Sequence, residues 1–199
     1  MPHNVFHNRA SALENEFFHR VDQKLIEQLH EHQTREVDED ALTIATGIVD
    51  RSVLDELIRV QISPKTLTAF SLFPAVYVAW ADGHVEAAER EAVLKSAENL
   101  GVSPASPAYE LLQSWLHEKP SVELFRAWEG FIHAVRPTLS AKGFLELQNG
   151  VTSRARKVAA AAGGILGVHK VSTGEEAAIE ALDVVFADAN AKSSASTEA

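Results

Sequence analysis

The chain has 199 residues, of which 46% are hydrophobic, so it can form a packed core and is not an intrinsically disordered chain. It contains no cysteine, which excludes disulfide bonds and thiolate zinc sites. Its formal net charge of −10 argues against nucleic acid or anionic lipid as a partner, because surfaces that bind phosphate are usually basic, and it favours cations or basic partners.

The sequence predicts neither a secretory signal nor a transmembrane segment. Residues 1–10 lack the apolar segment of a secretory signal, and we expect them to be disordered. The longest apolar run covers residues 158–168, whereas about twenty residues are needed to cross a bilayer. We therefore expect a cytoplasmic protein without a transmembrane segment, in which residues 158–168 belong to a buried helix.

The first third of the chain predicts helices only, because no stretch alternates as a β-strand would. Ser11 and Glu14 have the spacing of a capping box, which starts a helix. Next we expect an acidic linker over residues 36–40. One or two short helices should follow over residues 41–60, with a break near residues 47–50. The apolar positions of the first helix are Leu13, Phe17, Val21, Leu25 and Leu29.

The middle of the chain contains an almost entirely apolar segment. Ser63 and Pro64 predict the start of a helix, and Pro74 predicts either a kink or two short helices. Residues 69–81 should be buried, because a helix that is apolar on all sides has to be covered. A helix over residues 86–100 should follow.

The remaining helices are delimited by Gly, Ser and Pro. Gly101 should end the helix over 86–100, with Val102 as the apolar residue that follows such an end. Ser106-Pro107 and Pro120-Ser121 should each start a helix. Ser140 opens a long helix that reaches Gly167, and Ser172 opens the last one.

Together these patterns predict an all-α, compact bundle of about nine helices. We divide the chain into a disordered N-terminus (1–10), an N-terminal helical extension (11–62), a main helical domain (63–188) and a disordered tail (189–199).

Two segments are alike at a fixed offset, residues 79–93 and 165–179. Each segment predicts an apolar helix, a short polar turn with one apolar anchor, and an amphipathic helix. The aligned pairs are Val85 with Val171, Glu89 with Glu175, Ala92 with Ala178 and Val93 with Ile179. The pattern predicts a duplicated helix-turn-helix core.

Residues 78–94 (VAWADGHVEAAEREAVL) and 161–176 (AAGGILGVHKVSTGEE) resemble the tellurite-resistance TerB-like family. The resemblance spans roughly residues 63–188. It implies an all-helical fold built around two such helix pairs, and a bacterial stress-response module that also occurs in a DnaJ-like membrane co-chaperone. The second unit departs from the pattern: Val168 and His169 replace Asp82-Gly83, and Ser172 replaces Glu86.

The candidate site is a group of acidic residues. Asp82, Glu86 and Glu89 lie within eight residues around a helix start, and Glu175 and Glu176 could join them from the second unit. Carboxylates suit Ca²⁺, Mg²⁺ or Mn²⁺, and the resemblance implies a divalent metal at the acidic motif. Clustering without a cation should raise the pKa of at least one carboxyl.

Helix capping is the alternative explanation of the same carboxylates. Ser172 and Glu175 have capping-box spacing, and Glu89 holds the corresponding place in the first unit. An EF-hand is excluded, because Val78 and Trp80 occupy its first two ligand positions.

The sequence contains no complete catalytic motif: no His-Glu-x-x-His, no Gly-x-Ser-x-Gly and no phosphate-binding loop. Trp80, Trp115, Trp128 and Phe131 have the spacing of core residues, and a cofactor slot is the alternative. We expect a non-enzymatic module that binds a protein partner, and a homo-oligomer is compatible with this. The alternative is a metal-dependent hydrolase that uses Asp82, Glu86 and Glu89.

Overall fold

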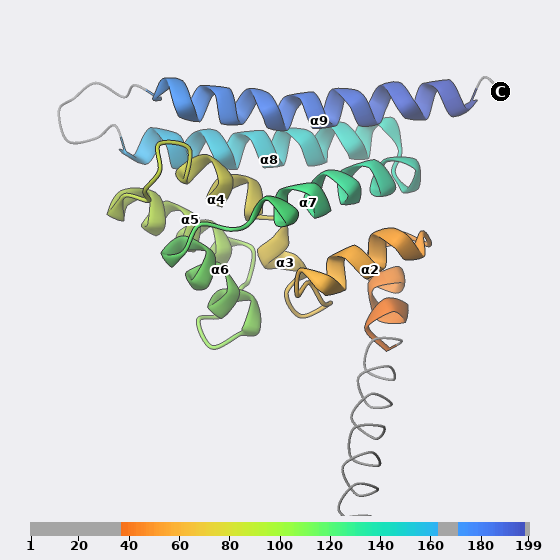
Figure 1. Cartoon of the computed structure of the whole chain (residues 1–199), viewed down its shortest axis with the longest axis horizontal. Coiled ribbons are helices and arrows are strands. Elements are labelled where there is room, and N and C mark those ends of the chain that lie inside the picture. Colours follow the sequence, from red (N-terminus) through yellow and green to blue (C-terminus); the bar gives the residue numbers. More distant parts are fainter. Residues whose placement is uncertain (1–36, 163–170, 198–199) are drawn as a thin grey trace, which may run out of the picture.

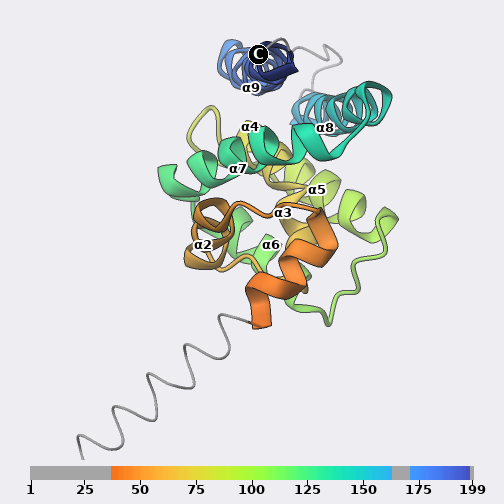
Figure 2. The ribbon, with the colours of Figure 1, turned by 90° about the vertical axis from the view of Figure 1, so that its right-hand side faces the viewer.

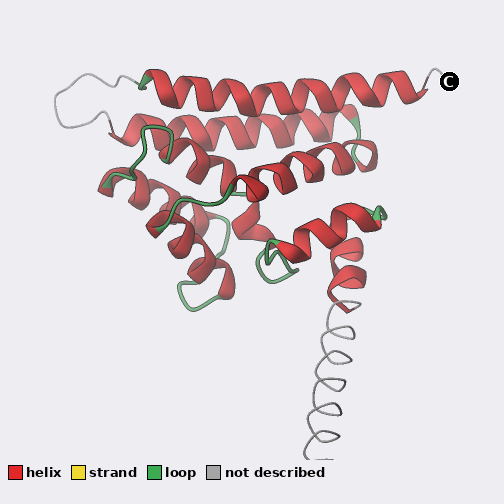
Figure 3. Ribbon diagram, in the orientation of Figure 1, coloured by secondary structure: helices red, strands yellow, loops and turns green. Residues whose placement is uncertain are grey.

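The computed structural model describes residues 37–162 and 171–197, and within them the ordered elements are helices, with no β-strand. Figure 3 shows these helices joined by short loops. The predicted all-α fold is confirmed. The predicted helix over residues 11–35 lies outside the described residues, as do Gly163, Gly164 and Gly167.

The described elements follow one another along the chain with short connections. They are a helix over residues 37–46, α2 (Arg51–Arg59), α3 (Leu67–Phe70), α4 (Phe73–Ala79), α5 (Ala87–Asn99), α6 (Pro107–His117), α7 (Val122–Val135), the 3₁₀ turn η1 (Arg136–Thr138), α8 (Ala141–Ala162) and α9 (Thr173–Thr197).

The two longest described helices, α8 and α9, lie antiparallel and side by side along one side of the molecule (Figure 1). The view in Figure 2 looks along these two helices and shows α4 and α7 directly beneath them. α4 packs against both α8 and α9, α5 packs against α8, and α7 packs against α9. α2, α3 and α6 lie on the far side of this middle layer.

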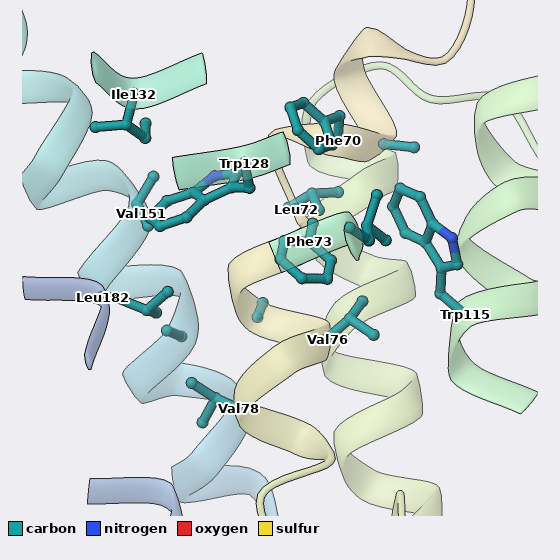
Figure 4. Close-up of a cluster of buried hydrophobic side chains, with 14 of the residues drawn as sticks. Phe70, Leu72, Phe73, Val76, Val78, Trp115, Trp128, Ile132, Val151 and Leu182 are labelled. Atoms are coloured by element: carbon teal, nitrogen blue, oxygen red, sulfur yellow. The ribbon is translucent and has the colours of Figure 1, made fainter. Parts of the chain in front are cut away.

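The short helix α4 is the centre of the core. Each of its residues except Tyr77 is buried. Figure 4 shows Phe73, Val76 and Val78 between Trp115 on one side and Val151 and Leu182 on the other. Most of residues 69–81 are buried, as predicted. In the described part of the run 158–168, Val158 and Ala159 are fully buried and Ala160 is exposed, and α8 packs along α4.

Several predicted helix ends are confirmed. The segment forms two short helices, α3 and α4, instead of one kinked helix, and Pro74 lies in the first turn of α4. Gly47 and Gly101 have positive φ angles of 74° and 81°, which glycine adopts without steric cost. Beyond Gly101, the Val102 amide donates to the Ala97 carbonyl at 3.0 Å, and the Val102 side chain is 7% exposed.

Ser63-Pro64 does not start a helix, contrary to the prediction. Residues 64–66 form a turn, and α3 begins at Leu67. Thr66 stabilises this turn: its Oγ1 accepts from the Ser63 amide at 2.9 Å and donates to the Gln61 carbonyl at 3.2 Å. A Ser-Pro pair is compatible with a turn as well as with a helix start, and the Thr66 hydroxyl favours the turn here.

Two segments predicted to be irregular are helical. Residues 37–40, expected to be an acidic linker, begin the helix over 37–46. The expected disordered tail 189–199 is helical through Thr197. Ala189 continues the buried face of α9 at 2% exposure, and Arg136 Nε donates to Asn190 Oδ1 at 2.7 Å, so this part of the helix has tertiary contacts.

Within the described ranges, no helix combines the length and the apolarity needed to span a bilayer.

Candidate functional site

The turn before α5 ends in a capping box built from two glutamates. Glu86 is the N-cap, and its backbone N–H donates to Glu89 Oε2 at 2.7 Å. The Glu86 side chain in turn accepts from the backbone N–H of Glu89. Both bonds use donors that a helix start leaves without a partner. Glu89 is only 2% exposed.

The start of α9 repeats this arrangement with a serine at the N-cap. The Ser172 amide donates to Glu175 Oε2 at 2.6 Å, and the Glu175 amide donates to Ser172 Oγ at 3.1 Å. Glu175 is 5% exposed. The predicted capping box at Ser172, with Glu89 as its counterpart, is therefore present in both places.

The two helix starts lie close to each other. A Cβ atom added to Gly174 would lie 3.1 Å from the Ala81 carbonyl oxygen, so the first turn of α9 packs tightly against the turn that follows α4. The second carboxylate oxygen of Glu175, Oε1, is buried without a hydrogen-bond partner. The structure thus brings together two buried acidic side chains from distant parts of the chain.

This arrangement raises the pKa of Glu89 to about 7. Burial is the largest cause, because it disfavours the charged carboxylate, and the negative charges of Glu175, Asp82 and Glu86 add to it. The hydrogen bond from the Glu86 amide acts in the opposite direction. The raised pKa expected for clustered carboxylates is present at Glu89.

The other three predicted carboxylates lie toward solvent. Asp82 is exposed and lies 3.4 Å from His84 Nδ1, and Glu86 is half-buried. Glu176 is exposed and pairs with Arg156 at 3.5 Å. Across residues 37–162 and 171–197, no three His, Asp or Glu side chains are grouped so as to hold a metal ion.

Glu89 and Glu175 are therefore explained by helix capping. Each uses one carboxylate oxygen to hold a backbone N–H, and each is closed off from solvent. A general acid or base has to come within hydrogen-bond reach of its substrate, directly or through one water. In this structure both side chains are buried and already bonded to backbone amides, so neither reaches solvent where a substrate would bind, although the Glu89 pKa of about 7 would suit such a role.

A second feature, the aromatic slot, opens between α4 and the start of α7. It is a cavity of about 230 Å³ with Phe73, which is almost fully buried, among its lining residues. Tyr77 and Phe125 pack together in its wall, with ring centroids 4.7 Å apart. The complete lining is Phe73, Tyr77, Trp80, Lys119, Pro120, Ser121, Val122 and Phe125.

The aromatic slot is held in shape by the core beneath it. Trp80 Nε1 donates to the Trp115 carbonyl at 2.8 Å, which fixes the indole against α6. Phe73 also contacts Trp115 edge-on, at 6.0 Å between centroids. Since the polar atom of Trp80 is already bonded, the indole presents apolar surface to the slot.

A polar basin of about 460 Å³ adjoins the slot and shares Lys119, Pro120 and Ser121 with it. Its charged lining consists of Glu56, Arg59, Glu118, Lys119 and Glu123. Glu56 and Arg59 lie 3.9 Å apart. Hydrogen bonds from its own backbone N–H and from Ser121 lower the pKa of Glu123, so this carboxylate stays charged at neutral pH.

The sequence did not predict the aromatic slot. Trp115 and Trp128 are buried, as predicted, but Trp80 and Phe131 are only half-buried. Helical spacing identifies the face of a helix that points inward, but it does not show where neighbouring helices fail to close over that face. The signal nearest to the slot was Pro120-Ser121, which marks the start of α7 at its rim.

No protein-family model, curated protein or solved structure matches this chain.

Proposed function

We propose that this protein is a non-enzymatic helical module that binds a protein partner through the aromatic slot. The observation that carries the proposal is an open cavity with aromatic walls beside a polar basin. Protein interfaces often combine a buried aromatic or aliphatic anchor with a polar rim. Phe73, Tyr77 and Phe125 would provide the anchor pocket, and Lys119 and Glu118 belong to the rim.

The size of the slot favours a side chain over a whole small molecule. Typical small-molecule pockets measure roughly 300–1,000 Å³ and contain several converging polar groups. The slot has about 230 Å³ and is mainly aromatic and aliphatic. One large apolar side chain of a partner would fill it, with the partner's polar groups over the basin.

The TerB-like resemblance of residues 78–94 supports a role in a bacterial stress response, or in maintenance of the cell envelope, and we include a cytoplasmic location in the proposal. The chain's negative charge supports a protein partner over nucleic acid. A metal-dependent hydrolase has less support, because Glu89 and Glu175 are buried and bonded to backbone amides.

The test compares two substitutions of equally exposed apolar residues. Val122, at the rim of the slot, is 57% exposed, and Leu145 on α8 is 55% exposed. Proteins that wild type captures from cells of the source organism would be identified, and the purified candidate would be titrated against wild type, Val122→Glu and Leu145→Glu by calorimetry. We expect Val122→Glu to weaken binding about tenfold or more and Leu145→Glu to leave it unchanged.

Tryptophan fluorescence provides a second readout, since Trp80 lines the slot and the other two tryptophans are buried. The partner should change the emission of wild type, and Trp80→Phe should remove most of that change. A partner that binds Val122→Glu as tightly as wild type would show that the slot is not the binding surface.

A further inference from the structure

The three most exposed large apolar side chains in the described ranges lie close together in sequence, at their N-terminal end. Ile44 is 86% exposed, Val49 79% and Val37 67%. Val37 and Ile44 are seven residues apart on the helix over 37–46 and share one face of it. We call these two residues, with Val49 in the connection to α2, the N-terminal apolar patch.

The opposite face of the same helix packs into the core. Leu42 is fully buried in the core, so the helix is held in place by its inner side while Ile44 points to solvent. Single exposed apolar residues are ordinary, but three within thirteen positions form a cluster, and exposed apolar clusters are typical of surfaces that bind a partner.

The residues that directly precede the patch supply a candidate cover. The stripe Leu13, Phe17, Val21, Leu25 and Leu29 predicts an amphipathic helix, whose apolar side also needs a partner. No Gly or Pro occurs from residue 11 to residue 46. Without such a turn signal between the stripe and the patch, the stripe is poorly suited to fold back onto the patch of its own chain.

We propose that two copies of the chain associate through this end, with the apolar stripe of each copy covering the N-terminal apolar patch of the other. Such an exchange is two-fold symmetric, because each copy both donates a stripe and receives one. It closes with two copies, and it buries both apolar surfaces without requiring the chain to reverse direction. The proposal is independent of the aromatic slot.

The test measures the mass of the full-length chain in solution by sedimentation equilibrium over a range of concentrations. We expect a dimer for wild type. Ile44→Glu should weaken the dimer roughly 30-fold or more, because a charge would then have to be buried against the stripe. Val184→Glu, at a position on α9 that is 52% exposed, is the matched control and should remain dimeric.

Leu25→Glu tests the other half of the exchange and should also weaken the dimer. A mixture of Ile44→Glu and Leu25→Glu should form a mixed dimer more readily than either variant alone, because one intact stripe then meets one intact patch. Circular dichroism melting should show that Ile44→Glu remains folded, since that side chain is almost fully exposed.

Two results would overturn the proposal. A wild-type chain that stays monomeric at high concentration would leave the patch without this partner. A dimer that Leu25→Glu disrupts and Ile44→Glu does not would mean that the stripes pair with each other and leave the patch uncovered.

Discussion

The starts of α5 and α9 are both closed by a capping box, but with different N-cap residues. In both, a buried glutamate three positions after the N-cap accepts a hydrogen bond from the N-cap amide. The N-cap is Glu86 in the first and Ser172 in the second. Ser172 caps without adding a charge, whereas Glu86 adds a negative charge next to Glu89 and helps to raise its pKa.

The residues on either side of the buried glutamates differ as well. Ala88 precedes Glu89 and is exposed, whereas Gly174 precedes Glu175 and packs against the Ala81 carbonyl. In both turns, the hydrogen bond from the N-cap amide places the buried carboxylate. The neighbouring residues determine how far the pKa of the carboxylate is raised and how closely the two turns approach.

The largest expected effect is on the pH dependence of stability. The pKa of Glu89 is about 7 in the folded protein, above its ordinary value of 4.5, so folding favours the protonated form. Its contribution to stability is complete below about pH 4.5 and is lost as the pH rises through 7, by about 3 kcal/mol in total. Glu89→Gln is neutral throughout and should not show this loss.

Urea unfolding of both proteins between pH 4 and pH 8 measures this difference. The control is Glu98→Gln, which changes an exposed carboxylate on the same helix and should follow wild type. If the stability difference between wild type and Glu89→Gln did not vary with pH, the folded pKa of Glu89 would not be raised.

The next effect concerns the close approach of the two turns. In Gly174→Ala, the new methyl group would lie 3.1 Å from the Ala81 oxygen, so this backbone atom and the start of α9 would have to separate by a few tenths of an ångström. We expect a loss of roughly 1–2 kcal/mol in the free energy of unfolding. Thermal and urea unfolding measure it.

The sign of this change is informative, because alanine is the better helix former and would stabilise α9 if the space were open. The control is Gly130→Ala in α7, where nothing lies within 4 Å of the added methyl group. That substitution should stabilise the protein by up to about 1 kcal/mol. A stabilising Gly174→Ala would contradict the close packing of the two turns.

A smaller effect is expected from making the first helix start resemble the second. Glu86→Ser retains a capping side chain and removes one of the charges that raise the Glu89 pKa. The pKa of Glu89 should fall, and the protein at pH 8 should gain a few tenths of a kcal/mol. NMR titration of the Glu89 side chain measures the shift, and an unchanged pKa would show that Glu86 does not contribute.

The smallest expected effect is that of divalent cations. Since the described carboxylates form no group of three that could hold a metal, millimolar Ca²⁺, Mg²⁺ or Mn²⁺ should leave the melting temperature unchanged. A rise that EDTA reverses would instead show a cation site, and Glu89→Gln would then test whether Glu89 is one of its ligands.

Much of the fold could be predicted because the signals are local. Gly101, Pro74 and the Ser106-Pro107 pair act on the backbone within a few residues, and the Ser172 capping box depends on spacing alone. Residues 37–40 and 189–197 were mispredicted because their composition suggested irregular structure. In the second segment, tertiary contacts such as that of Ala189 favour the helix.

The candidate site could be predicted only in part. Local spacing identified Glu89 and Glu175 as capping residues, and the repeat aligned them as counterparts. Their burial, and the unpartnered Glu175 Oε1, depend on how α4, α5 and α9 pack. The aromatic slot depends on a gap between α4 and α7, which no property of either helix alone reveals.

The position of α4 has a consequence for the order in which the molecule can fold. Its apolar surface is covered largely by α8 and α9, which come last in the described chain. Ribosomal synthesis delivers α4 well before these helices, so the growing chain carries an uncovered apolar segment until its final third has emerged. Completion of the α8–α9 pair is therefore the step that covers α4, and an apolar segment left uncovered until then is prone to aggregation.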